Sequence, residues 1–139
     1  MIAMSRVTEL LESYVLWDDM AKAKRRELDR MRDRRMSVRI SYSGAPRGAP
    51  QTLADYMAER EELEADLEEI KIRRFEVFSQ IMRLMLKLES RKQFDIIYRR
   101  YIHRDSWKRI CRDLDVKRST ATDLHARAIS ALEKIDAGG

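Results

Sequence analysis

Hydrophobic residues recur at spacings of three and four through two long parts of the chain, which is the pattern of one face of an α-helix. In the first part, about Val7 to Arg35, the stripe consists of Val7, Leu10, Tyr14, Trp17, Ala21, Lys24, Leu28 and Met31. In the second, about Thr52 to Leu88, it consists of Leu53, Tyr56, Leu63, Leu67, Ile70, Val77, Ile81, Leu84 and Leu88, interrupted by Arg60 and Arg74, with a second row at Phe75, Phe78, Met82 and Met85. Helices of this length need a neighbour to cover them, so the pattern predicts a coiled coil or a helical hairpin.

Shorter helical patterns follow Leu88. Ser90 with Gln93 three residues later forms a capping box, which predicts a helix that continues to Ile102. Asp105 or Ser106 can cap the next helix. Its inward positions are Trp107, Ile110, Cys111 and Leu114. After a break at residues 114–117, a last helix begins near Arg118 or Ser119, with Ala121, Leu124, Ala128 and Leu132 inward. Two short helices in close succession predict a helix-turn-helix.

The composition agrees with a chain of long helices, because 38% of the residues are charged and only 4 are Gly and 2 are Pro. We therefore expect an all-α fold, a long helical hairpin or coiled coil joined to a C-terminal helix-turn-helix. Four segments are predicted: an N-terminal amphipathic helix at 1–35, a flexible linker at 36–51, a long coiled-coil helix at 52–88 for dimerisation or a hairpin, and a DNA-binding domain at 89–139. The apolar faces suit pairing within one chain or between two.

The net charge of +5 is unevenly distributed. Residues 1–50 carry 11 Lys or Arg against 7 Asp or Glu, residues 51–88 carry 6 against 9, and residues 89–139 carry 12 against 8. In an antiparallel hairpin the basic run from Lys22 to Arg35 lies beside the acidic run from Glu59 to Glu69, so we expect it to be mostly neutralised. The alternative is that the basic run adds phosphate contacts to a bound duplex.

The last helix has the chemistry of a helix that enters a DNA groove. Small hydroxyl side chains at its N-terminal end allow a close approach to base edges, while Arg and Lys nearby reach guanine or phosphate. The capped start of the preceding helix offers free backbone N–H groups to a phosphate. The candidate DNA-binding residues are Ser106, Lys108, Arg109, Arg112, Lys117, Arg118, Ser119, Thr120, Thr122, Asp123, His125 and Arg127. The alternative is an ordinary helical pair that closes a bundle.

Enzymatic chemistry is not expected from this sequence. It has no Gly-rich phosphate loop, and His103, Cys111 and His125 match no zinc-ligand spacing or nucleophile set, so no cofactor and no metal are predicted. Cys111 is expected to be a packed thiol. We find no secretory signal and no apolar run long enough for a membrane span, so the expected location is the cytoplasm, without membrane contact.

The C-terminal segment resembles region 4 of sigma factors and related phage regulators. The resemblance rests on Tyr98, Tyr101, Ile102, Ser106, Trp107, Ile110, Leu114, Val116, Arg118, Ser119, Thr120, Leu124, Ala128 and Leu132. With the N-terminal helix, linker and long helix before it, the chain is similar to the RinA and ArpU type of phage late transcription activators. The family turn has Gly where this chain has Asp115 and Ser where it has Lys117. Asp tolerates the left-handed conformation, whereas Lys117 cannot cap a helix, so Ser119 is a substitute cap.

This resemblance implies a DNA-binding activator of phage or prophage late genes that acts on double-stranded DNA with host RNA polymerase, in the cytoplasm of the bacterial host cell. A homo-oligomer, with a dimer favoured, fits a two-fold DNA site. The alternative is a phage small terminase subunit, which recognises DNA for genome packaging. A third class is a coiled-coil adaptor whose C-terminal helices bind protein.

Overall fold

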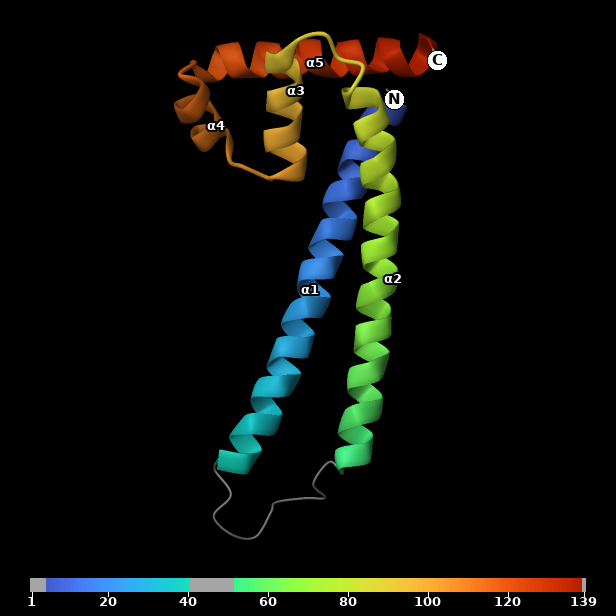
Figure 1. Ribbon diagram of the computed structural model, residues 1–139. Helices are drawn as coiled ribbons and strands as arrows, with labels where there is room; N and C mark the ends of the chain where they lie inside the picture. The colour runs from blue at the N-terminus through green and yellow to red at the C-terminus, as the bar shows by residue number, and fades with distance from the viewer. Residues whose placement is uncertain (1–4, 41–51, 139) are drawn as a thin grey trace, which may run out of the picture. The chain divides into compact units, whose positions relative to one another are not determined.

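The computed structural model describes residues 5–40 and 52–138, and all regular structure in these ranges is helical (Figure 1). The elements are α1 (Arg6–Ile40), α2 (Leu53–Met85), α3 (Arg91–Ile97), the π-helical turn η1 (Tyr98–Ile102), α4 (Trp107–Leu114) and α5 (Arg118–Gly138). The predicted all-α class is confirmed. None of the described helices is long and apolar enough to cross a membrane.

Hydroxyl side chains cap the N-terminal ends of the two long helices. Ser5 Oγ accepts a hydrogen bond from the backbone N–H of Thr8 at 3.2 Å, and Thr52 Oγ1 accepts one from that of Asp55 at 3.0 Å. The first helix runs beyond the predicted end at 35, because the next Gly or Pro in the chain is Gly44 and nothing in residues 36–40 breaks a helix. Residues 36–40 of the predicted linker are therefore helical, and residues 41–51 lie outside the described residues.

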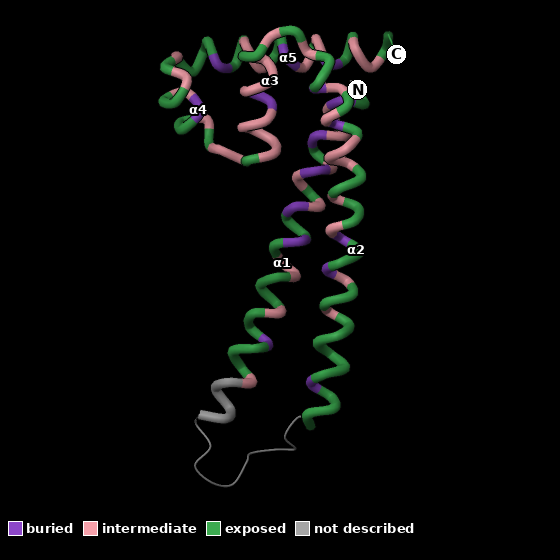
Figure 2. The backbone as a smooth tube through the Cα atoms, viewed as in Figure 1, coloured by how far each residue is buried: buried purple, intermediate pink, exposed green. Residues whose placement is uncertain are grey.

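Two compact units divide the chain. The terminal unit combines Met1–Leu16 with Arg74–Gly139, and the hairpin unit is Trp17–Arg73. Both long helices contribute a part to each unit. Figure 2 shows buried residues along α3 and along the first turns of α1, while the Leu53 end of α2 is almost entirely exposed.

The terminal unit has one continuous core. In it α3 packs chiefly on α5, and α4 packs on α5 and η1. The buried side chains come from every α-helix of the unit, and they are Val7, Leu11, Tyr14, Ile81, Met85, Ile96, Ile97, Ile110, Ala121, Ala128 and Leu132. Leu11 is only 1% exposed, so it, more than the predicted Leu10, carries the core contact of the first helix. Phe75, which was predicted to widen the apolar face of α2, is 66% exposed instead.

The hairpin unit has a thin core, formed by Ala21, Leu67 and Ile70 with Trp17 and Leu28 against them. Its two helices run antiparallel, since Lys24 lies beside Asp66 and the Arg35 guanidinium lies 5.3 Å from the centre of the Tyr56 ring. Leu53 was predicted in the seam but is 57% exposed.

The opposite charge runs of the hairpin unit lie side by side as predicted, but they are sparsely paired. The Lys24–Asp66 ion pair is long, at 4.0 Å. Among the residues that the structure describes, Arg25, Arg32 and Arg34 have no ion-pair partner. Lys22 pairs with Asp18 and Lys24 with Glu27 and Asp66, so the expected neutralisation of the basic run is only partial among the described residues.

Candidate nucleic-acid interface

The start of α4 is capped as the sequence predicts. Ser106 has extended backbone angles, φ −67° and ψ 154°, and its Oγ accepts a hydrogen bond from the backbone N–H of Arg109 at 3.1 Å. Ser106 is thus the cap, although Asp105 was an equal candidate. The cap leaves the first N–H groups of α4 at the surface beside the exposed Lys108.

The turn between α4 and α5 ends the first helix through a residue in the left-handed conformation. Asp115 has φ 53° and ψ 52°, and its N–H donates to the carbonyl of Arg112 at 3.3 Å. The next residue, Val116, donates to the carbonyl of Cys111 at 3.0 Å. These two bonds form a Schellman motif, and the contact of Val116 and Cys111 with the core completes it. The prediction that Asp115 takes the place of the usual Gly is confirmed, and Cys111 is packed as expected.

The second helix of the pair begins at Arg118. The carbonyl of Lys117 accepts a hydrogen bond from the N–H of Ala121 at 3.0 Å, so Lys117 is the last residue before the helix. Ser119 lies inside the first turn and is not the cap, which corrects the substitute proposed from the sequence. Ser119, Thr120 and Thr122 are all exposed.

Small side chains hold the two helices close together. Ala121 and Ala128 on α5 are fully buried, and so is Ile110 on α4. All three belong to the core on which α3, α4 and α5 pack, so close packing of this core restricts how α5 can move relative to α4. The exposed first turns of α5 are therefore carried on a rigid support.

An aromatic cluster joins η1, α4 and α5. The guanidinium of Arg118 lies 4.6 Å from the centre of the Trp107 ring, and the guanidinium of Arg100 lies 4.9 Å from the same centre. His125 meets the same ring edge-on at 5.3 Å, and its Nε2 is 2.8 Å from the hydroxyl of Tyr101. Trp107 therefore orients the first residue of α5 as well as filling the core.

The His125 ring is half-buried in this cluster, so it differs from the other candidates. Burial lowers the pKa of His125, and the neighbouring positive charge of Arg100 lowers it further. Burial likewise raises the pKa of Tyr101. A half-buried ring with a lowered pKa that is hydrogen-bonded to a phenol acts in packing, so His125, a candidate from the sequence, is not expected to contact DNA.

Three arginines converge on Asp113 at the surface of α4. Its carboxylate lies 2.8 Å from Arg99 of η1, 3.4 Å from Arg112 and 3.9 Å from Arg109. The hydrogen bond from Arg99, followed by that from Arg112, lowers the pKa of Asp113. Arg99 also lies 3.8 Å from the carboxylate of Asp105, so three cations share two carboxylates and this surface keeps a net positive charge.

Eleven of the twelve candidate residues are exposed, His125 being the exception. Arg127 is paired with Asp123 at 3.2 Å on the outer side of α5, which partly neutralises both. Sequence reasoning missed Arg99 and Arg100. Their partners are distant in sequence, and the π-helical turn that carries them shifts the helical register, so spacing contains no signal for either contact.

Comparison with known proteins places the chain in a family. Residues 34–133 match the model of a family described as a protein of unknown function, DUF1492, and the chain belongs to that family. No curated protein matches the chain. No solved structure matches it either.

Proposed function

We propose that α4 and α5 form a helix-turn-helix that binds double-stranded DNA, and that the protein regulates transcription. The observation that carries the proposal is the exposed row of hydroxyl side chains at Ser119, Thr120 and Thr122, in the first turns of a helix anchored by the buried Ala121. A helix that presents short polar side chains at its N-terminal end can approach the base edges of a major groove.

The positions of the surrounding cationic side chains support this role. Lys108 and Arg109 flank the start of α4, and Lys117 and Arg118 flank the start of α5, all exposed. In this proposal the two helix starts and their cations contact phosphates and position the protein, while the hydroxyls contact bases and give specificity. The positive surface around Asp113 extends the phosphate contacts to Arg99 of η1.

The particular regulatory role rests on the resemblance to the RinA and ArpU type of activators. In that role the protein activates phage or prophage late genes, and it acts with host RNA polymerase at a promoter. No side chain described above identifies the polymerase contact. The resemblance alone supports this part of the proposal.

A test of the DNA contact uses duplexes selected from random sequence by the full-length protein, with binding followed by fluorescence anisotropy. The double variant Thr120→Ala/Thr122→Ala should bind the selected duplex at least about 10-fold more weakly and lose preference at particular base pairs, since base contacts discriminate by about 1–3 kcal/mol each. Ser130→Ala is the matched control, because Ser130 is an exposed hydroxyl further along the same helix. Equal affinity and preference in the double variant and the wild type would contradict the assignment of α5 as the reading helix.

A second binding experiment distinguishes phosphate contacts from base contacts. Lys117→Ala should weaken binding to all duplexes alike and reduce the slope of log K against log salt by about 1. Lys134→Ala, which removes an exposed charge far along α5, is the control. If the wild-type protein shows no salt-dependent DNA binding at all, the C-terminal helices bind protein instead.

A promoter reporter tests the regulatory role. Activation that requires Thr120 and Thr122 supports transcription control, and host polymerase should be retained on promoter DNA together with the protein. A genome-packaging role would instead be indicated by two results together: the protein binds specific DNA without affecting the reporter, and light scattering shows a ring of many subunits.

A further inference from the structure

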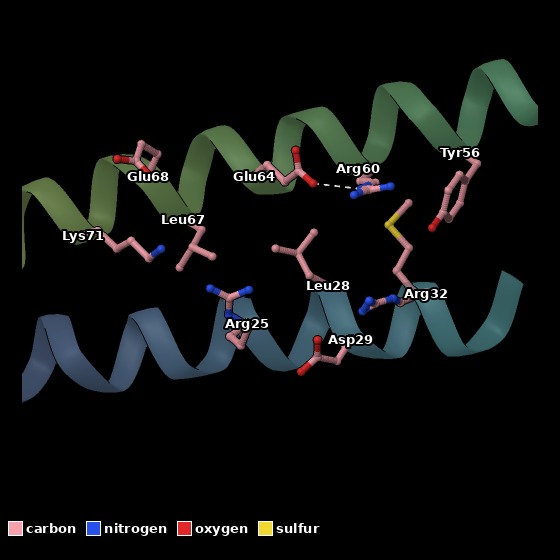
Figure 3. A pocket seen from close by; sticks show the side chains of 11 residues that line it. Arg25, Leu28, Asp29, Arg32, Tyr56, Arg60, Glu64, Leu67, Glu68 and Lys71 are labelled. Carbon is pink, nitrogen blue, oxygen red and sulfur yellow. Dashed lines mark hydrogen bonds and ion pairs between the residues drawn. The ribbon is translucent and has the colours of Figure 1, made fainter. Parts of the chain in front are cut away.

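A groove of ≈ 350 Å³ opens between α1 and α2 on one face of the hairpin unit (Figure 3). Leu28 and Leu67 form its apolar floor, Arg25 and Arg32 line it from α1, and Glu68 lines it from α2. Within the described part of the chain, these two arginines and this glutamate have no ion-pair partner. The groove therefore combines apolar surface with unpaired charges of both signs.

The helix α2 has a second stripe beside this groove, distinct from the seam that faces α1. Its members are spaced by three or four residues and are all exposed, and they are Leu53, Met57, Glu61, Glu64, Glu68 and Ile72. The apolar members are 57%, 45% and 52% exposed at Leu53, Met57 and Ile72. Since Glu64 and Glu68 also line the groove, stripe and groove belong to one face. A helix with two apolar stripes is typical of one that packs on two neighbours.

We infer that a second copy of this chain covers this face, so that two hairpin units associate into an antiparallel four-helix bundle. The inference is independent of DNA binding. Charge complementarity identifies the occupant: α1 carries eight Lys or Arg against five Asp or Glu over residues 17–35, and α2 carries three against eight over residues 53–73. A two-fold axis parallel to the helices lays the basic helix of each copy on the acidic helix of the other.

The two-fold axis gives the contacts between the two copies the same helix register as the contacts within each hairpin. Within the chain, Lys24 is level with Asp66 and Arg35 with Tyr56. A rotation about an axis parallel to the helices moves no residue along them. Arg25 of one copy therefore lies level with the stretch between the partner's Glu64 and the partner's Glu68. Arg25, which has no ion-pair partner among the described residues of its own chain, thus meets the partner's Glu68, which has none either, across the interface.

A nucleic acid fits this face less well than a second copy does. Half of the face is the acidic side of α2, including Glu61, Glu64 and Glu68, and these carboxylates repel a phosphate backbone. A second copy satisfies both signs of charge and covers Leu53, Met57 and Ile72 as well.

Sedimentation equilibrium of the full-length protein, without DNA, tests the inference. The wild type should be a dimer. Arg25→Glu/Arg32→Glu should raise the dimer dissociation constant by about 30-fold or more, because two-fold symmetry doubles every lost pair and each reversal adds repulsion. The matched control is Arg30→Glu/Arg34→Glu, which makes the same charge change at residues that line a different groove of the hairpin unit. The control should change the constant by about threefold at most.

Mixing two charge-reversed variants is the decisive experiment, because it distinguishes a lost interface from misfolding. Glu61→Lys/Glu68→Lys should also weaken self-association, and an equimolar mixture with Arg25→Glu/Arg32→Glu should form a heterodimer, with helix content followed by circular dichroism. A monomeric wild type overturns the inference. The inference is also overturned if Arg30→Glu/Arg34→Glu weakens the dimer as much as Arg25→Glu/Arg32→Glu does, or if neither variant weakens it. It is overturned as well if the mixed variants are folded but remain monomeric.

Discussion

The two units of this chain differ in how completely they bury their side chains. In the terminal unit, Ile96, Ile97 and Ile110 are entirely buried, whereas the buried hydrophobic residues described in the hairpin unit are fewer and each keeps 3–8% of its surface exposed. The terminal unit brings helices together from both ends of the sequence, so each helix is covered on more than one side. A two-helix hairpin has one seam only. We conclude that conformational stability is concentrated in the terminal unit.

The largest expected effect tests this difference directly. Ile110→Ala should lower the free energy of unfolding of the terminal unit by about 2–5 kcal/mol, because it leaves a cavity in a closed core. Leu67→Ala in the hairpin unit should cost about 2 kcal/mol or less, because neighbouring side chains can collapse into the open site. Each unit contains one tryptophan, Trp107 and Trp17, so fluorescence of single-tryptophan variants in urea reports them separately.

Leu86→Ala serves as the control for that comparison. Leu86 is 73% exposed, so its truncation should stay within about 0.5 kcal/mol of the wild type. If Leu67→Ala costs as much as Ile110→Ala, the two units are equally well packed and the comparison fails.

A smaller effect is expected from pH, and only in the terminal unit. Burial lowers the pKa of His125 in the folded protein below its usual value, so the folded state favours the neutral ring. The stability from this neutral ring is fully present above about pH 6.5, the pKa of an unfolded histidine, and is lost as the pH falls through the folded pKa. Urea unfolding followed by Trp107 should show this loss, and His125→Gln should reduce it.

The outcome for His125 also bears on the assignment of the interface. An NMR titration of the ring should give a pKa below the usual value for histidine. A raised pKa would mean that the imidazole faces solvent or an anion and belongs with the DNA-contacting residues after all.

The smallest expected effect concerns the turn. Asp115→Gly should stabilise the terminal unit by about 0.5–1 kcal/mol, because a residue with a Cβ is strained at φ 53° and glycine is not. The Schellman hydrogen bonds use only the backbone and remain. Ala126→Gly, in the exposed middle of α5, should have the opposite sign at about 1 kcal/mol. Thermal unfolding by circular dichroism measures both, and a loss of stability in Asp115→Gly would show that the carboxylate has a role in the turn.

Local signals made much of the architecture predictable. Ser90 and Ser106, both predicted as helix caps, each accept a hydrogen bond from the backbone N–H three residues later. Helical periodicity identified both long helices and the buried Ile110, Ala121, Ala128 and Leu132 of the helix-turn-helix. Cap chemistry and periodicity involve residues within a few positions of each other, and for this reason one sequence is enough to read them.

Contacts between distant residues were not predictable in the same way. Arg99 pairs with Asp113 and Arg100 lies over Trp107, and both contacts depend on the π-helical turn after α3. The exposure of Leu53 and Phe75 was also missed, because a helix with two apolar stripes offers two possible seams and periodicity alone does not choose between them.

The sequence by itself determined that the chain is helical, where most helices begin, and which small residues lie at the joint of α4 and α5, because these properties follow from local backbone chemistry. Only the tertiary structure decided three further points: that His125 is half-buried while Thr120 and Thr122 stay exposed, that Arg118 lies over Trp107, and that Arg25, Arg32 and Arg34 of α1 have no ion-pair partner among the described residues. Each depends on which faces of separate helices meet, and that is settled by packing rather than by spacing along the chain.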